Sequence, residues 1–112
     1  MANNDHQYLG FGISSATLRY QVPDNVTDHI FYAASSTSAS TQLFKVTGKG
    51  SVVCNSAAIA TNATDGFLYF PTCAGTPTGA PTANTGSAAM VYDTTANKIW
   101  VYNGSWRGIV VV

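Results

Sequence analysis

Three side chains that could take part in acid–base chemistry lie close together in the sequence: Asp24, Asp28 and His29. A hydrolytic site needs its nucleophile, base and orienting group to meet within about 2.6–3.2 Å. Sequence neighbours on a turn and at a strand start have no special reason to meet in this way. We therefore interpret the aspartates as turn caps and the histidine as a strand residue. The chain has no Glu, no catalytic carboxylate pair and no nucleotide-binding motif, so we predict a non-enzymatic protein without a cofactor.

Aromatic residues form the other group with chemical potential, and they gather in the last third of the chain: Tyr92, Trp100, Tyr102 and Trp106. Aromatic rings beside amide and carboxylate groups can bind sugars, because a sugar ring stacks on the aromatic face while polar groups contact its hydroxyls. Aromatic residues that face each other across strands also build cores and subunit interfaces. We favour the core or interface interpretation and retain a glycan site at these four residues as the alternative.

Metal binding has little support in the sequence. Asp93, Asn97 and Asn103 could offer oxygen ligands, but no D-x-D-x-D run accompanies them. Cys54 and Cys73 are the only cysteines, and they lack both CxxC spacing and a histidine cluster. A disulfide between them remains an alternative. Because the first residues lack signal-peptide features, we expect reduced thiols, and we predict no metal site.

The composition points to β-structure and to a surface covered by other chains. The sequence has 15 Ala, 14 Thr and 10 Val against four Leu, and 46% of its residues are apolar. Helix formers are scarce and β-branched residues common, which predicts an all-β fold. Five acidic and five basic residues leave no net charge, so we expect no nucleic-acid partner. No window approaches the ~20 apolar residues of a membrane span, so we expect no insertion into a membrane. Soluble monomers usually carry about a quarter of their residues as charges. The low charge here favours an assembled protein, with a Thr/Ser-rich monomeric domain as the alternative.

The strands that must position these residues can be read from alternation and turn signals. In the last quarter we predict a three-stranded antiparallel meander over 88–93, 98–102 and 105–112, with turns at 94–97 and at Asn103-Gly104, the latter of type I′. The middle strand carries large side chains on both faces, which predicts a partner chain. Upstream we predict a strand or extended segment over 8–13 and strands over 16–23, 29–33, 42–47, 51–54 and 66–71. We expect residues 72–87, which are rich in Thr, Gly and Pro, to be too irregular for a ladder.

The order of short pieces in the first half resembles the bead module of bacteriophage fibre proteins. The resemblance is carried by Leu18–Pro23, by His29–Tyr32 and by Leu43–Val52 with its Gly-Lys-Gly turn. It implies a homotrimer in which three chains share one core. The shared core would include one residue set, taken from all three segments: Leu18, Tyr20, Phe31, Phe44 and Val46.

The second half is similar to a small module near the ends of phage structural and tail-fibre-like proteins. Its hallmarks are a GTPTGxP loop within Asp65–Thr82, a VYDTT strand end within Met90–Thr95 and a KIWVYNGxW hairpin at Lys98–Trp106. The chain is far shorter than a full fibre. The resemblance therefore implies a short fibre or capsid decoration protein, with an adhesin tip that binds host surface polysaccharide as the alternative.

These observations predict two small antiparallel modules that are intertwined as a homotrimer. We assign residues 1–14 to an attachment arm, 15–62 to the bead module and 63–112 to the meander module. Tyr8, Leu9 and Phe11 are the candidates for contact with the particle. The expected partners are further copies of the chain, capsid or tail proteins, and a host glycan in the alternative. The expected location is the virion, after synthesis in the host cytoplasm.

Overall fold

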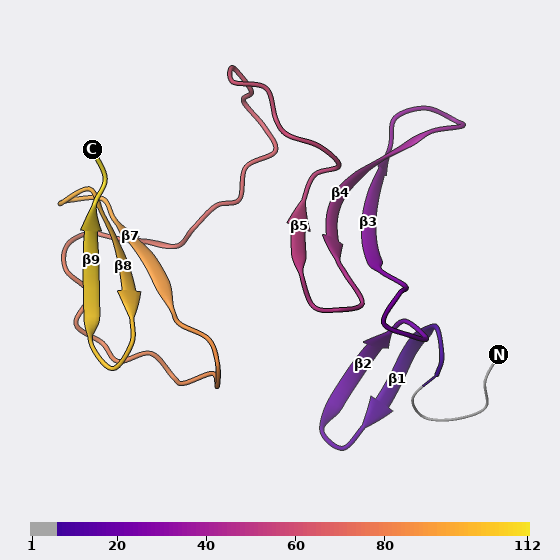
Figure 1. The fold of residues 1–112 in the computed structure, drawn as a ribbon, viewed down its shortest axis with the longest axis horizontal. Coiled ribbons are helices and arrows are strands. Elements are labelled where there is room, and N and C mark those ends of the chain that lie inside the picture. The colour runs from indigo at the N-terminus through magenta and orange to yellow at the C-terminus, as the bar shows by residue number, and fades with distance from the viewer. Residues whose placement is uncertain (1–6) are drawn as a thin grey trace. The chain divides into compact units, whose positions relative to one another are not determined.

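A computed structural model describes residues 7–112, and the described residues form nine β-strands and no helix (Figure 1). The predicted all-β class is confirmed. No helix in the described part of the chain could cross a membrane. The chain divides into two compact units, Met1–Phe67 and Leu68–Val112. The predicted boundary lay near residue 62.

The first unit begins with a two-stranded hairpin. Strand β1 (Gly10–Ser14) pairs antiparallel with β2 (Thr17–Gln21), and Ser15 and Ala16 form the connection. Ala16 has a φ of 55°, the left-handed region that L-residues other than Gly, Asn and Asp seldom enter. The predicted attachment arm covers residues 1–14. Its residues 10–14 form β1, and its residues 1–6 lie outside the described residues.

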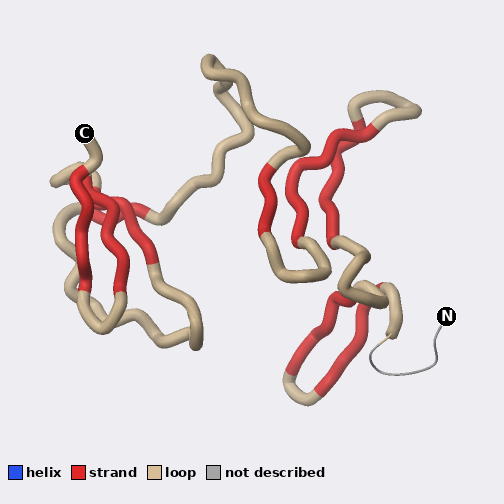
Figure 2. The backbone as a smooth tube through the Cα atoms, viewed as in Figure 1, coloured by secondary structure: helices blue, strands red, loops and turns tan. Residues whose placement is uncertain are grey.

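A three-stranded antiparallel sheet completes the strands of the first unit (Figure 2). It consists of β3 (His29–Ala34), β4 (Ser40–Val46) and β5 (Val52–Cys54), in that order. The register pairs Phe31 with Phe44 and then Tyr32 with Gln42, so Leu43 is the extra residue of a bulge. The predicted Gly-Lys-Gly turn is confirmed: Gly50 has a φ of 94° and donates its N–H to the Thr47 carbonyl at 2.9 Å.

The second unit is a four-stranded sheet of β6 (Thr72–Cys73), β7 (Met90–Asp93), β8 (Lys98–Tyr102) and β9 (Trp106–Val110). The β7–β8–β9 meander confirms the prediction. The exclusion of residues 72–87 from a ladder was wrong at one point, because β6 pairs with β7. That pair is parallel, so the module is mixed rather than purely antiparallel. The strand predicted over 66–71 was also wrong: these residues lie outside all strands of the described chain, and only the Pro71 carbonyl bonds to one, accepting from the Tyr92 N–H of β7 at 3.0 Å.

The Asn103-Gly104 pair makes a hairpin of a different type from the one predicted. Tyr102 pairs with Trp106, so the loop has three residues, 103–105. Only Gly104 has a positive φ, at 75°, whereas a type I′ turn requires positive φ at both central residues. The hairpin itself is confirmed, but the type I′ assignment was wrong, because in a three-residue loop one left-handed residue suffices.

Packing within the chain leaves the described residues without an apolar core. No apolar side chain among residues 7–112 is fully buried, and the one fully buried residue is Asp93. Large apolar side chains are exposed on most strands. Folded domains of this size normally bury several such residues. The apolar faces of the strands are therefore exposed on the surface of the single chain.

Candidate functional site

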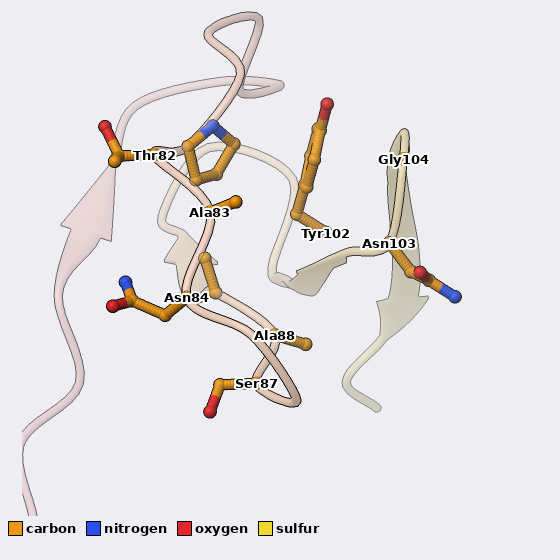
Figure 3. A pocket seen from close by; sticks show the side chains of 10 residues that line it. Thr82, Ala83, Asn84, Ser87, Ala88, Tyr102, Asn103 and Gly104 are labelled. Atoms are coloured by element: carbon orange, nitrogen blue, oxygen red, sulfur yellow. The ribbon is translucent and has the colours of Figure 1, made fainter.

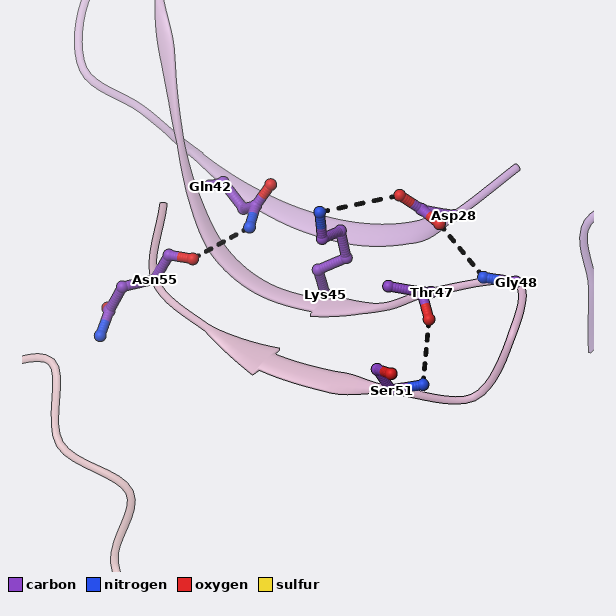
Figure 4. A network of polar contacts seen from close by, with 7 residues as sticks. All are labelled: Asp28, Gln42, Lys45, Thr47, Gly48, Ser51 and Asn55. Atoms are coloured by element: carbon purple, nitrogen blue, oxygen red, sulfur yellow. Dashed lines mark hydrogen bonds and ion pairs between the residues drawn. The ribbon is translucent and has the colours of Figure 1, made fainter. Parts of the chain in front are cut away.

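The acid–base candidates have structural roles. Asp24 accepts hydrogen bonds from the Thr27 hydroxyl at 2.7 Å and the Val26 N–H at 3.1 Å, which lower the pKa of its carboxyl. Asp28 accepts from the Gly48 N–H at 3.1 Å and lies 3.8 Å from the Lys45 ammonium (Figure 4). Each aspartate holds a turn or a loop in place. His29 begins β3 and packs its ring against Tyr20.

One face of the β1–β2 hairpin is apolar and uncovered. The register places Phe11 opposite Tyr20 and Ile13 opposite Leu18. The rings of Phe11 and Tyr20 lie 5.2 Å apart between centroids. Residues that are directly opposite on paired strands share a face, so these four side chains form one patch, and all four are exposed. Leu18 and Tyr20 were predicted interface residues.

The patch continues onto the β3–β4–β5 sheet through His29. Its ring lies 4.7 Å from the Tyr20 ring, and it pairs with Val46, which in turn pairs with Val52. On the same face Phe31 lies 5.9 Å from Phe44 between ring centroids. We call the combined surface the apolar stripe and define it by eight residues: Phe11, Ile13, Leu18, Tyr20, Phe31, Phe44, Val46 and Val52. All five predicted interface residues belong to it.

The apolar stripe is large for a surface exposed to water. Six of its residues are more than half exposed: Phe11, Ile13, Leu18, Tyr20, Phe31 and Val52. At roughly 150–200 Å² per large side chain, their exposed parts sum to on the order of 700 Å². The largest apolar patch on a typical monomer is about 300–600 Å². Each partner in a stable interface contributes about 800 Å², so the stripe is of the size that a subunit interface needs.

The three predicted attachment residues are not brought together. Phe11 lies on the apolar stripe, and Leu9 is exposed just before β1. Tyr8 lies against Gly12 and Arg19. These two residues pair with each other next to the Phe11–Tyr20 pair, so they lie on the opposite face of the hairpin. The Arg19 guanidinium lies 5.7 Å from the centre of the Tyr8 ring. A Cβ on Gly12 would lie 2.8 Å from the Tyr8 Cζ atom, so glycine is needed for this contact.

The second unit is organised around a buried carboxylate. Asp93 Oδ1 accepts from the N–H groups of Gly75, Thr95 and Ala96, and Oδ2 accepts from the Trp100 indole at 3.3 Å. Burial raises the pKa of Asp93, but these four hydrogen bonds outweigh it and hold the pKa below its ordinary value of 3.8. The carboxylate therefore stays ionised and joins the 72–79 loop, the 94–97 turn and β8. The sequence signal was the Asp at the end of an apolar strand, before a Thr-Thr turn.

The four predicted sugar-binding aromatics do not form one cluster. Trp100, Tyr102 and Trp106 share a face of the sheet, whereas Tyr92 pairs with Ile99 on the other face. Both tryptophan indoles make hydrogen bonds within the unit. The Trp100 indole donates to the Asp93 carboxylate, and the Trp106 indole donates to the Gly79 carbonyl at 2.7 Å. Tyr92 donates to the Asn97 side chain at 3.0 Å. These hydrogen bonds hold three of the four half-buried residues in place within the second unit.

Of these four aromatic residues, Tyr102 is the one that lines a pocket (Figure 3). The cavity has a volume of about 280 Å³ and lies between the 81–89 loop and residues 102–104. The Tyr102 ring makes an edge contact with the Trp106 ring, with 5.2 Å between the ring centroids. The backbone N–H of Tyr102 donates to the Ala89 carbonyl at 3.0 Å. In Figure 3 the methyl groups of Ala83 and Ala88 point toward the Tyr102 side, whereas the Asn84 and Ser87 side chains point away. No charged side chain lines the pocket.

Cys54 and Cys73 are both free cysteines. Cys54 is exposed on β5, and Cys73 is half-buried with its thiol donating to the Gly75 carbonyl at 3.2 Å. Among residues 7–112 there is also no group of three or more His, Cys, Asp or Glu side chains with metal-binding geometry.

No family model matches the sequence, and comparisons with curated proteins and with solved structures found no significant match. The functional interpretation therefore depends on the surfaces described above.

Proposed function

We propose that the protein is a non-enzymatic virion structural protein, a short trimeric phage fibre or a capsid decoration protein. Its activity is assembly: copies of the chain bury their apolar stripes against one another, and the assembled protein contacts capsid or tail proteins. The resemblances carried by Leu18–Val52 and by Asp65–Trp106 motivate the virion context.

The observation that carries the proposal is the absence of any buried apolar side chain within residues 7–112, together with a stripe of about interface size. Burial of apolar surface contributes about 25 cal/mol per Å², so a chain that buries so little alone gains most of this term by association. The five predicted interface residues lie within this one stripe. A stripe that continues across two separate sheets suits a neighbour that wraps along the unit.

The virion role is tested by mass spectrometry of phage particles purified from cells that produce this protein. We expect the protein to co-purify with particles through density-gradient banding and to be present in a copy number that is a multiple of three. Its absence from banded particles, with its presence in the soluble lysate, would contradict the proposal.

The Tyr102 pocket supports a second candidate function, the binding of a neutral polysaccharide. A sugar ring can stack on an aromatic ring that is already held in place, and the absence of charged side chains in the pocket favours a neutral ligand. We expect Tyr102→Ala to lose binding to an array of neutral oligosaccharides. Tyr92→Ala is the matched control, because Tyr92 lies on the other face of the same sheet. Equal binding by both variants would remove the candidate.

A further inference from the structure

Four consecutive large apolar residues, Phe67 to Phe70, lie outside every strand and are exposed by 49–84%. In the described part of the chain, their backbone N–H and C=O groups make no hydrogen bond. Soluble proteins avoid runs of exposed apolar residues of this kind unless the run has a function. Phe and Tyr have high strand propensity, and Gly66 and Pro71 bound the run as they commonly bound a strand. Phe67–Phe70 therefore has the composition of a β-strand but lies outside every sheet of the described chain.

The first unit also has a sheet whose edge strand, β3, could pair with a further strand. Among the described residues, strand β3 pairs on one side only, with β4, and its other edge has no partner strand. Unpaired edges are normally kept short or protected by charged side chains. With six residues, β3 is the longest edge strand in the described sheets, and Ile30–Ala34 contains no charged residue. The other edges suit a four-residue segment less well: β5 and β6 have three and two residues, β2 and β9 carry Arg19 and Arg107, and β1 contains two glycines, which weaken strand pairing.

We propose that Phe67–Phe70 adds as a strand to the β3 edge of a second copy of this chain. The inference rests on the proposed self-assembly and names the segment that links the copies. Pairing would satisfy the backbone groups of the segment and of the β3 edge together. Because side chains alternate along a strand, one half of the segment would extend the apolar stripe beside Phe31, and the other half would cover the sheet face that carries Ile30 and Tyr32.

This exchange fits a closed ring. Each copy donates one strand and accepts one at a different surface, which is a head-to-tail contact. Such contacts generate a ring when the rotation between copies closes, and a trimer is the ring that the fibre resemblance implies. The donated segment leaves no edge of β3 available for open-ended association.

Hydrogen exchange on the assembled, unmodified protein tests the inference directly. We expect the amides of 67–70 to exchange about tenfold or more slower in the assembled protein than in protein dissociated by dilution. Each new ladder bond lowers the population of the open, exchanging state by about this factor. Amides of 30–33 that point to the free edge should slow in parallel. Fast exchange at 67–70 in a protein that is otherwise assembled would overturn the strand-addition inference and leave the proposed assembly standing.

Proline substitutions provide a second test. Neighbouring amides in a strand point to opposite sides, so either Leu68→Pro or Tyr69→Pro removes a ladder donor, and each disturbs the strand. We expect both variants to lose most of the assembled species in sedimentation velocity. Ala58→Pro is the matched control, since Ala58 is also exposed outside any strand and its N–H makes no backbone hydrogen bond. Full assembly of both variants would overturn the inference. A wild-type chain that stays monomeric would instead overturn the assembly itself.

Discussion

Replacing Phe31 by Ala should dissociate the assembled protein, because Phe31 is an exposed aromatic residue of the apolar stripe. Its side chain is 58% exposed in the single chain. With roughly 200 Å² for a Phe side chain and about 25 cal/mol per Å², full burial of this exposed part contributes about 3 kcal/mol per copy. Three copies in a trimer lose about 9 kcal/mol, which raises the dissociation constant by about six orders of magnitude.

Tyr32→Ala is the matched control for this substitution. Tyr32 is the next residue on β3 and is equally exposed, at 58%. It points to the opposite face of the sheet, since side chains alternate along a strand. Both substitutions remove an aromatic ring from the same strand, so their effects on strand propensity are similar. We therefore expect a smaller effect on assembly from Tyr32→Ala than from Phe31→Ala.

The assay is sedimentation velocity over a concentration series, with circular dichroism to check that the β-structure is retained. We expect Phe31→Ala to sediment as a monomer at concentrations at which the wild type and Tyr32→Ala remain assembled. If Phe31→Ala assembles like the wild type while Tyr32→Ala dissociates, the wrong face of the sheet has been assigned to the interface.

Three further substitutions test the internal structure of the units. The folded-state pKa of Asp93 lies below its ordinary value of 3.8, so its contribution to stability is present above that value and is lost as the pH falls through the folded pKa. Acid titration followed by Trp fluorescence should show this loss, and Asp93→Asn should flatten it; an unchanged titration would contradict the role. Gly108→Ala should destabilise the second unit by about 1–3 kcal/mol in urea unfolding, because its Cβ would lie 2.8 Å from the Trp100 ring; wild-type stability would show that the ring is not held there. Ala16→Gly should raise the thermal midpoint slightly, because the left-handed φ of 55° costs Ala roughly 1–2 kcal/mol, and Gly offsets part of that gain in the unfolded state; a lower midpoint would contradict the assigned turn.

Local signals in the sequence were sufficient for most of the strands. The alternation of Leu18, Tyr20 and Val22 predicted the strand observed at Thr17–Gln21, and the 98–102 strand was predicted with the observed bounds. These strands are set by side-chain periodicity and by nearby turn residues, which act over a few positions. The same alternation placed the predicted interface residues on one side of each strand.

Features that depend on distant pairing were missed. The β1–β2 connection uses Ser15 and Ala16, which are not a favoured turn pair, so the hairpin had no local signal. The parallel β6–β7 pair joins residues separated by the whole 74–89 loop. The segment 66–71 looks like a strand by composition, but a strand requires a partner along its length, and in the described chain only the Pro71 carbonyl bonds to a strand.

The candidate sites show the same division. Aromatic composition alone grouped Tyr92 with Trp100, Tyr102 and Trp106, whereas the register separates Tyr92 onto the other face. The sequence shows Asp93 only as an acidic residue at the end of an apolar strand before a Thr-Thr turn. Its partners could not be inferred from type and spacing, because three of its four donors are backbone N–H groups whose positions follow from the fold.

The mass of the purified protein in solution, measured by multi-angle light scattering, tests the central claim most directly. The account predicts a stable species with a mass close to three times the 11.7 kDa of one chain, which denaturant dissociates. A folded, soluble species of 11.7 kDa at the same concentration would contradict it, because a single chain would then be stable with its apolar strand faces exposed to water.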